Sequence, residues 1–487
     1  MKLSSTVTLV FTAMAMANAQ STKSTSSKSS TSSTTTHNAP PPQKSPEWLS
    51  HVVPLSGNVQ SYPSGGKSIP TGPLPSVSFD ISGYPEGWKS PPTTSAEVKA
   101  AIAAIDWSMV PNVPVRKSDN NGDLSMTGYD DAKDPDCWWS ATGCVTPKNA
   151  SIPADVANCP NVGDWGLTYD DGPLTADDGG KWAEPELYDF LAAHNNQKAG
   201  LFYIGSNVIA APAAAQRALA NGHTLCVHTW SHPAMTSQTN HQIVAELYWT
   251  MKAIKEVTGV TTKCWRPPYG DVDNRVRAIA WQMGLTTVLW DEDTDDWNMP
   301  GEGGGNLPPA TVDGYFEGWI NSRKNGTDNK HGHIVLQHEL NNSTVSMAEK
   351  WLPKIQQVFN VVPWNQCFNI SNPYWETNFV YPVADESIPK NAATVTTSPS
   401  ASASASVAAS PASLSANTVT STPTDNSTPT DNSASTDNSA SNDNSASTDG
   451  TASSVHAAGA VSASAGSRVT AASTAGLFGA LLFAVLY

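Results

Sequence analysis

From Val162 onward, short apolar runs alternate with longer segments in which apolar residues recur every three or four positions. Short apolar runs predict buried strands, and the longer periodic segments predict helices. We expect strands at residues 165–168, 200–204, 224–227, 261–265, 286–290 and 333–336. We expect helices at residues 186–194, 212–220, 242–257 and 345–358.

The order of these elements predicts the architecture. Alternating strands and helices form parallel sheets, because each helix returns the chain to the starting edge of the sheet. About seven such strands over roughly 200 residues predict an α/β fold, a distorted (β/α) barrel with outer helices, whose chemistry gathers at the C-terminal strand ends. Residues 40–158 are instead rich in Pro, Gly and Trp, with one helical stretch at 96–105. We expect them to wrap around the barrel as an extension.

Both ends of the chain carry patterns of another kind. Lys2, an apolar stretch and the small residues 17–19 are typical of a secretory signal peptide, so we expect residues 1–19 to be removed. Residues 477–487 are apolar but too few to span a bilayer, and small residues and a polar spacer precede them, as in a glycosylphosphatidylinositol (GPI) signal. We expect residues 468–487 to be removed and the anchor to be attached at one of four residues: Ser462, Ala463, Ser464 or Gly466.

The segment before this tail resembles a stalk. Residues 391–467 consist almost entirely of Ser, Thr, Ala, Asn and Asp, with repeats such as TPTDNS. Too few apolar side chains are present to offset the entropy of folding, and the hydroxyls suit O-glycosylation. Residues 20–158 would then be a Ser/Thr-rich segment plus the extension, 159–367 the folded head and 368–390 a C-terminal extension. The stalk would hold the head outside the plasma membrane, within a cell wall.

Composition narrows the class of protein further. Lys and Arg number 27 against 43 Asp and Glu, a net charge of −16, which argues against a nucleic-acid partner. Six cysteines in a secreted chain predict up to three disulfides. We expect Cys159–Cys367 and Cys137–Cys144, while Cys226 and Cys264 are either paired or simply buried. Sequons in the head predict N-glycosylation at five candidates: Asn149, Asn325, Asn341, Asn342 and Asn369.

Unusual polar clusters follow the expected strands. The first strand runs into Asp170 and Asp171, adjacent carboxylates that need a cation or a proton to coexist, although an ordinary Asp-Gly-Pro turn is an alternative. The third strand runs into His228 and His232, and neutral imidazoles suit a borderline metal such as zinc. Two His and one Asp would leave positions open for water and substrate, as a catalytic site requires.

Three further clusters lie at residues 266–271, 293–297 and 334–339. Since side chains alternate along a strand, Ile334, Leu336 and His338 share one face. The pattern therefore predicts a histidine beside an apolar wall at the site.

Together, these five clusters resemble the polysaccharide deacetylase family with the NodB-type domain, carbohydrate esterase family 4, over roughly residues 159–360. The signal peptide, stalk and anchor make the whole chain similar to fungal cell-wall members that act on chitin. The resemblance implies metal-dependent hydrolysis of N-acetyl groups of GlcNAc residues, giving chitosan and acetate. It implies one zinc or cobalt ion as cofactor, chitin and its oligosaccharides as partners, a GPI-anchored protein at the plasma membrane and cell wall, and a monomer.

The resemblance also implies roles for the polar residues at the strand ends. Asp170 would be the catalytic base, and Arg266 would keep it ionised and oriented. Asp171 would bind the metal together with His228 and His232.

The remaining clusters would supply the acid and the substrate contacts. His338 would be the general acid, oriented by Asp296. The backbone N–H of Tyr269 would help to bind the oxyanion, and Trp297 with Leu336 would form the pocket for the acetyl methyl group.

Tryptophans and departures from the family pattern complete the picture. Trp230 and Trp297 lie nearest to the motifs and are expected to stack on sugar faces, while most of the 17 Trp residues are expected in the core. Tyr169 stands where the family usually has Phe, and Glu339 stands where it usually has Asp. Neither change removes a catalytic group.

Alternative functions differ in substrate or in activity. The same site could deacetylate peptidoglycan or acetylxylan, and the chain could be a catalytically silent chitin-binding wall protein. A glycoside hydrolase is poorly supported, because its two carboxylates lie about 5–10 Å apart across a sugar and need no His pair.

Overall fold

The computed structural model describes residues 43, 46–55, 61–63, 69–118, 124–175 and 184–382. The expected signal peptide, stalk and anchor tail lie outside the described residues, as do the attachment candidates Ser462, Ala463, Ser464 and Gly466. Within the described ranges, no helix has the length and apolar character needed to cross a membrane.

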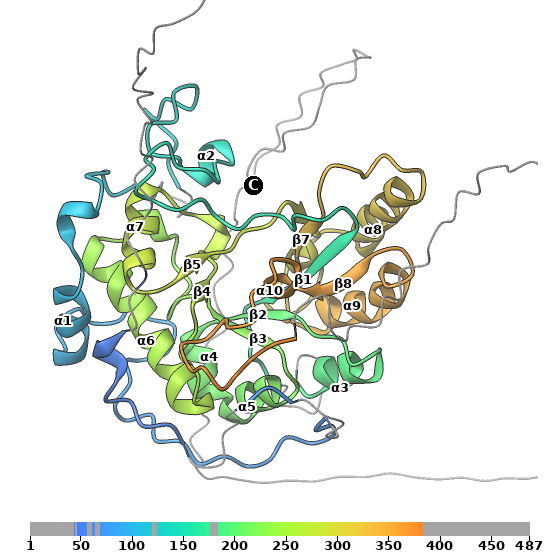
Figure 1. Ribbon diagram of the computed structural model, residues 1–487, viewed down its shortest axis with the longest axis horizontal. Coiled ribbons are helices and arrows are strands. Elements are labelled where there is room, and N and C mark those ends of the chain that lie inside the picture. Colours follow the sequence, from blue (N-terminus) through green and yellow to red (C-terminus); the bar gives the residue numbers. More distant parts are fainter. Residues whose placement is uncertain are drawn as a thin grey trace, which may run out of the picture. The chain divides into compact units, whose positions relative to one another are not determined.

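A parallel β-sheet forms the centre of the described chain (Figure 1). Its strand order is β5-β4-β3-β2-β1-β7-β6, with β8 also paired to β1. The strands are β1 Asp164–Asp170, β2 Gly200–Tyr203, β3 Thr224–Val227, β4 Cys264–Trp265, β5 Thr286–Thr287, β6 Glu292–Asp293, β7 His333–Leu336 and β8 Asn360–Pro363. All these pairings are parallel, which confirms the predicted α/β class.

The sheet is curled into a distorted barrel. Its edge strands β5 and β6 are consecutive in the chain, and only residues 288–291 separate them. Five residue steps span at most about 17 Å, so the two edges must come close together. The edges do not pair with each other in the strand order; instead, Val156 of the N-terminal extension forms a parallel bridge with Val288, just after β5. The barrel is therefore open at one seam, and the extension covers that seam.

Strand β1 is the central element. All seven of its residues are buried, as expected for a parallel strand covered on both faces. Its first half pairs with β7 and β8, whereas Thr168 to Asp170 pair with β2. This change of partner brings the end of β1, with its two aspartates, to the middle of the sheet edge.

Helices surround the sheet, with α6 and α7 on one side of the view and α8 and α9 on the other (Figure 1). The longest, α6, begins with a capping box formed by Thr239 and Gln242 and ends at Gly259, whose φ of 88° suits glycine. The helices are α1 Ala96–Ala103, α2 Trp139–Thr142, α3 Glu186–Ala193, α4 Gly205–Ala210, α5 Pro212–Ala220, α6 Asn240–Thr258, α7 Asn274–Gln282, α8 Pro309–Lys324, α9 Asn342–Ile355 and α10 Trp364–Cys367.

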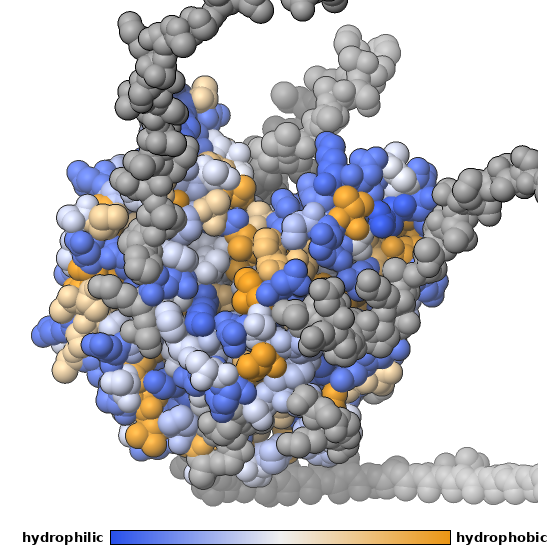
Figure 2. Space-filling view, viewed as in Figure 1, coloured by the Kyte–Doolittle hydropathy of each residue, from blue (hydrophilic) through white to orange (hydrophobic). Residues whose placement is uncertain are grey.

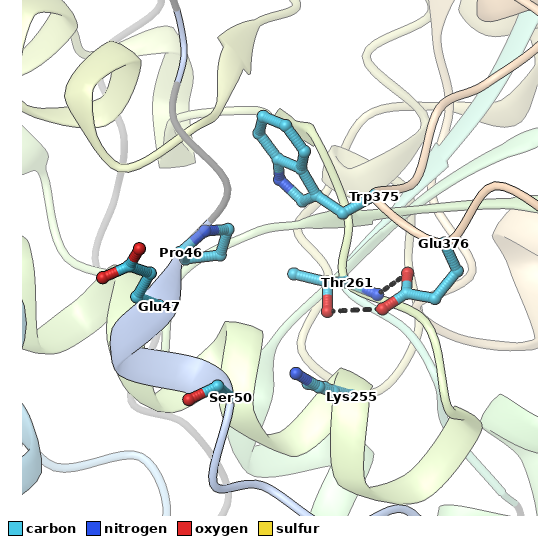
Figure 3. A pocket seen from close by; sticks show the side chains of 7 residues that line it. All are labelled: Pro46, Glu47, Ser50, Lys255, Thr261, Trp375 and Glu376. Carbon is cyan, nitrogen blue, oxygen red and sulfur yellow. Dashed lines mark hydrogen bonds between the residues drawn. The ribbon is translucent and has the colours of Figure 1, made fainter.

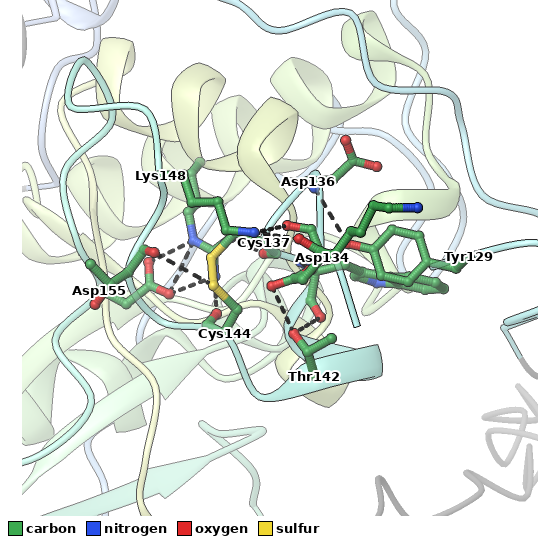
Figure 4. The surroundings of a disulfide bond; sticks show 12 residues. Tyr129, Asp134, Asp136, Cys137, Thr142, Cys144, Lys148 and Asp155 are labelled. Atoms are coloured by element: carbon green, nitrogen blue, oxygen red, sulfur yellow. Dashed lines mark hydrogen bonds and ion pairs between the residues drawn. A yellow bond between two sulfur atoms is a disulfide. The ribbon is translucent and has the colours of Figure 1, made fainter. Parts of the chain in front are cut away.

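Three disulfides connect the described chain. Cys159–Cys367 and Cys137–Cys144 are confirmed, and Cys226–Cys264 joins the neighbouring strands β3 and β4. Figure 4 shows the Cys137–Cys144 loop, where Asp134 accepts a hydrogen bond from the Thr142 hydroxyl at 3.0 Å.

Arg277 of α7 holds this loop through backbone carbonyl oxygens. Its guanidinium donates to the carbonyl oxygens of Cys137 (2.5 Å) and Cys144 (2.7 Å), and it pairs with Asp155 at 2.7 Å. Burial outweighs the attraction of Arg277 and raises the pKa of Asp155 to about 6. One buried arginine thus ties the extension to the barrel.

The two extensions also meet over the start of β4, at the edge opposite the two aspartates. Pro46, Glu47 and Ser50 face Lys255, Thr261, Trp375 and Glu376 across a pocket of about 250 Å³ (Figure 3). The Glu376 carboxylate accepts hydrogen bonds from the backbone N–H (2.6 Å) and the hydroxyl (2.8 Å) of Thr261. Glu376 therefore fastens the C-terminal extension to the barrel.

The surface is largely hydrophilic on the face seen in Figure 2, with apolar residues scattered across it. Eight large apolar side chains are exposed in the described part of the chain: Val53, Ile81, Trp88, Val115, Met126, Val162, Tyr269 and Val380. Of these, only Tyr269 belongs to the expected site.

Candidate functional site

The two aspartates lie where β1 ends. Asp170 is the last residue of the strand, and Asp171 follows with a φ of 76°, a left-handed conformation that turns the chain sharply. Oδ1 of Asp171 lies 3.5 Å from Nε2 of His228 and 3.3 Å from Nε2 of His232. The structure therefore brings together the three residues expected to bind a metal.

Each of the two imidazoles has a polar neighbour at Nδ1, the ring nitrogen that does not face Asp171. Nδ1–H of His228 donates to the carbonyl oxygen of Arg266 at 2.8 Å, and Nδ1 of His232 lies 3.2 Å from the hydroxyl of Tyr269. A histidine whose Nδ1 donates a hydrogen bond keeps a lone pair on Nε2. Nε2 of His228, on the side of Asp171, is thus the nitrogen available to a metal.

These donors fit a divalent metal. Oδ1 of Asp171 is buried and has no hydrogen-bond partner among the described residues, as expected of an atom whose natural partner is a cation. The ligand atoms of Asp171, His228 and His232 all lie within 4.8 Å of one another. Burial would raise the pKa of Asp171, but the facing imidazoles outweigh it and hold the pKa well below the usual range. Two imidazoles and one ionised carboxylate suit a borderline cation with open coordination positions.

A buried glutamate that the sequence did not single out positions the histidine loop. Glu246 of α6 accepts hydrogen bonds through Oε2 from the N–H groups of Trp230 and Ser231, both at 2.9 Å, and through Oε1 from the Ser231 hydroxyl at 2.6 Å. The loop needs this support because Thr229 and His232 have φ values of 66° and 58°. The sequence signal was weak: one acidic residue on an otherwise apolar helix face.

The expected base, Asp170, is paired with a fully buried guanidinium. Nη1 of Arg266 donates to Oδ1 of Asp170 at 2.7 Å and to the Thr168 hydroxyl at 2.9 Å. The other guanidinium nitrogens donate to the carbonyl oxygens of Val288 (3.2 Å) and Leu289 (3.1 Å). Arg266 is thereby fixed from both sides, and the sequence did not reveal the part played by Thr168.

The expected acid, His338, follows β7 and is held by Asp296, which follows β6. Nδ1–H of His338 donates to Oδ1 of Asp296 at 2.7 Å, and the backbone N–H of His338 donates to Oδ2 at 3.0 Å. Burial lowers the pKa of His338, but the Asp296 carboxylate outweighs it and raises the pKa to about 9. The imidazole is therefore protonated at neutral pH and able to give a proton.

The expected substrate contacts divide into two groups. Tyr269 (44% exposed) and Trp297 (half-buried) lie at the surface of the site, and Leu336 is buried beside it on β7. Tyr269 adopts a φ of 59°. These positions are compatible with the roles that the resemblance implies.

Trp230 is a correction. Its side chain is fully buried, stacks on Tyr84 with ring centroids 5.8 Å apart, and donates from Nε1 to the carbonyl oxygen of Glu86 at 3.2 Å. No face of the ring is left for a sugar. Its position next to the histidine motif misled the prediction, because the loop turns this side chain into the core.

Glu339, the departure from the family pattern, lies under the aspartate turn. It is fully buried, and Oε2 accepts a hydrogen bond from the Tyr188 hydroxyl at 3.2 Å. A Cβ at Gly172 would lie 1.7 Å from Oε1 of Glu339, so any other residue there would force the buried Glu339 carboxyl to move. Burial and the adjacent carboxyl of Glu184 raise the pKa of Glu339 well above its usual range. Glu339 therefore lies directly beneath the aspartate turn, in surroundings that favour its protonated form.

The sequons differ in exposure. Asn149, Asn325, Asn342 and Asn369 are exposed. Asn341 is only 2% exposed; its Oδ1 accepts from the N–H groups of Ser343 and Thr344 at the start of α9, and its Nδ2 donates to the Glu302 carbonyl oxygen. A glycan on Nδ2 would have no room beside this buried side chain and would disturb its contact with Glu302, so Asn342 is the better candidate of this overlapping pair.

Comparison with known protein families finds a match over strands β1 to β5. Residues 157–288 match the polysaccharide deacetylase family. The matched segment contains Asp170, Asp171, His228, His232 and Arg266. This part of the chain is therefore similar to polysaccharide deacetylase domains.

The particular proteins that it resembles are fungal chitin deacetylases. The chain is 47% identical over 283 residues to the chitin deacetylase of Amylomyces rouxii, across 58% of this chain and 64% of the relative. It is 46% identical over 263 residues to chitin deacetylase 2 of Cryptococcus neoformans var. grubii, across 54% and 55%. The chain thus spans less than two thirds of the length of these relatives. A solved chitin deacetylase from Colletotrichum lindemuthianum aligns at 24% identity over 46% of this chain and 96% of its own, with a TM-score of 0.40.

Proposed function

We propose that the protein is a metal-dependent chitin deacetylase that hydrolyses the N-acetyl groups of GlcNAc residues to give chitosan and acetate. The observation that carries this proposal is the convergence, at the C-terminal edge of one sheet, of three parts. They are the Asp171, His228 and His232 cluster, the Asp170–Arg266 pair and the Asp296–His338 pair. The names of the relatives support chitin as the substrate.

The residues account for the steps of amide hydrolysis. Asp170, kept ionised by Arg266, would take the proton of the attacking water. The N–H of Tyr269 would donate to the developing oxyanion, and such donors typically contribute about 3–4 kcal/mol. His338 would then protonate the leaving amine, a step usually worth roughly 100- to 10,000-fold in rate.

A divalent ion held by Asp171, His228 and His232 would polarise the acetyl carbonyl and lower the pKa of water. The trio presents only three protein donors, which leaves room for substrate and water. Zinc and cobalt both accept such a ligand set.

We also propose a secreted, GPI-anchored protein of the plasma membrane and cell wall, acting as a monomer. Three disulfides and the exposed sequons support secretion. The anchor rests on the sequence pattern of the C-terminal tail alone.

The decisive experiment measures acetate release from chitin oligosaccharides by the full chain, before and after chelation and with zinc or cobalt restored. We expect activity that is lost on chelation, regained with metal and roughly 100- to 10,000-fold lower in Asp170→Asn, as expected for loss of a general base. The matched control is Asp130→Asn at an exposed site, which should keep full activity.

Other outcomes separate the alternatives. A folded, metal-loaded protein that releases acetate only from peptidoglycan fragments or acetylated xylan would move the assignment to those substrates. A protein that binds chitin and releases no acetate from any of them would be a wall-binding protein, and the deacetylase proposal would be wrong.

A further inference from the structure

A second cluster of metal-type ligands lies at the other ends of β6 and β7. His333 is the first residue of β7, His331 precedes it by two positions, and Asp291 and Glu292 lie at the start of β6. Asp296 and His338 follow the opposite ends of these two strands. The cluster is therefore separate from the catalytic edge, and the deacetylase chemistry makes no use of it.

The ligand atoms converge on one carboxylate oxygen. Oδ2 of Asp291 lies 2.8 Å from Nδ1 of His333 and 3.6 Å from Nδ1 of His331. Oε1 of Glu292 lies 3.7 Å from the same Nδ1 of His333. Zinc bonds of about 2.0–2.2 Å place tetrahedral ligand atoms about 3.3–3.6 Å apart. For an ion to bind, His333 would have to shift by about half an ångström. Nδ1 of His331 would also have to give up its hydrogen bond to the Gly332 carbonyl oxygen at 2.9 Å.

Glu292 is oriented for this role. Its Oε2 accepts a hydrogen bond from Nε1 of Trp319 at 2.7 Å, and this leaves Oε1 turned toward His333. The His331 side chain is 39% exposed, which gives an ion a path from solvent. The ligand atoms of Asp291, His331 and His333 all lie within 4.8 Å of one another, and Glu292 beside His333 offers a fourth ligand.

Asp328 supplies an independent observation. Its side chain is only 9% exposed, and Oδ1 lies 3.2 Å from Nε2 of His333. Oδ2 of Asp328 is buried with no hydrogen-bond partner in the described part of the chain. A carboxylate behind a histidine orients the ring and strengthens its other nitrogen as a metal ligand. In the metal-free geometry, a proton on Nδ1 of His333 faces Asp291, and a cation would replace that proton.

We propose that Asp291, Glu292, His331 and His333 form a second divalent metal site of the zinc type, and that Asp328 is its positioning residue. A metal here joins β6 to β7 at the ends away from the catalytic residues. The inference does not depend on the proposed function, because it concerns metal binding at a different place.

The test counts zinc. The full chain is freed of metal with a chelator and titrated with zinc, and bound zinc per chain is then measured by elemental analysis after gel filtration. We expect two zinc ions in the unaltered chain, one in His331→Ala and one in Asp171→Asn. His51, whose side chain is 50% exposed and pairs with Glu97, gives the matched control. The His51→Ala variant should bind two zinc ions.

The comparison between the unaltered chain and His331→Ala decides the matter. Equal zinc content in these two proteins, with both folded by circular dichroism, would overturn the second site. If the unaltered chain binds one zinc that His331→Ala loses and Asp171→Asn retains, the second site stands and the catalytic metal fails.

A thermal measurement guards against a folding artefact. Zinc should raise the Tm of Asp171→Asn, because a ligand that binds only the folded state stabilises it. The same addition should leave the Tm of the double variant Asp171→Asn/His331→Ala unchanged. An equal rise in both proteins would also contradict the second site.

Discussion

Asp296 controls the proton on His338, because its carboxylate touches both the ring and the backbone of that residue. The pKa of His338 is raised to about 9, and this determines how activity should change with pH. The imidazolium is present below pH 9 and is lost as the pH rises through 9. Activity that needs this proton should therefore fall on the alkaline side.

Asp296→Asn should move the alkaline limb of the kcat/KM profile to lower pH by more than one unit, because it removes the main attraction for the proton. The measurement is acetate release against pH at fixed metal concentration. Asp130→Asn serves as the control and should leave the limb in place. An unmoved limb in Asp296→Asn would mean that another group donates the proton.

At the same scale, Glu246→Gln should weaken zinc binding at the catalytic trio by about 10-fold or more, as other changes behind metal ligands do. The amide offers one acceptor oxygen where the carboxylate serves three donors. The exposed Glu317 provides the control, since Glu317→Gln should not change the affinity. Equal zinc affinities would show that the loop keeps its shape unaided.

At the scale of the element, the sequence predicted regular segments well and short ones poorly. The bounds of β3, β7 and α5 agree with the expected 224–227, 333–336 and 212–220. Strand β6 was missed because a strand of two residues carries no pattern of its own. Strand β8 was missed because its apolar residues come directly after the expected helix 345–358. Helix α7 was missed because two arginines interrupt its apolar face, and both are buried through ion pairs and hydrogen bonds.

The residues of the site also fall into those that the sequence predicted and those that it did not. The strand-end motifs brought together Asp170, Asp171, His228 and His232, which are close in space because parallel strands end at one edge. Glu246 could not be found, since a single acidic residue on a long helix carries no motif. Thr168 was hidden for a different reason: a threonine within a strand is unremarkable until its hydroxyl meets Arg266.

Helix packing leads to a prediction with a built-in contrast. A Cβ on Gly205, the first residue of α4, would lie 2.7 Å from Oγ1 of Thr250 on α6 and 2.7 Å from the Trp230 ring. Gly205→Ala should lower the free energy of unfolding by about 1–3 kcal/mol through overpacking. Gly314→Ala in α8, where nothing lies within 4 Å, should raise it by about 0.5–1 kcal/mol. Denaturant unfolding measures both, and a loss of stability in both variants would contradict the argument.

For the whole molecule, the three disulfides should contribute differently to the free energy of unfolding, because they close loops of different length. Cys159–Cys367 joins residues 208 positions apart, against 7 for Cys137–Cys144. In the chain-entropy account the longer crosslink stabilises by about 5 kcal/mol and the shorter by about 2.5 kcal/mol.

Replacing both cysteines of each pair by alanine, in separate proteins, should therefore cost more stability for Cys159–Cys367. The measurement is the free energy of unfolding of the two double variants against the unaltered chain. A larger loss from removing Cys137–Cys144 would place the main restraint in the Arg277 network rather than in chain length.

The seam beside β5 has a consequence for the use of the folded head in protein engineering. The backbone N–H of Val156 donates to the Thr287 carbonyl oxygen at 2.9 Å, and the Val156 carbonyl oxygen accepts from the Leu289 N–H at 2.8 Å. The family-matched segment 157–288 does not include Val156, so it lacks these two hydrogen bonds to the barrel. The family-matched segment is thus not a unit that can be cut at its sequence borders and inserted into another protein. A chimeric protein would have to include the N-terminal extension together with this segment.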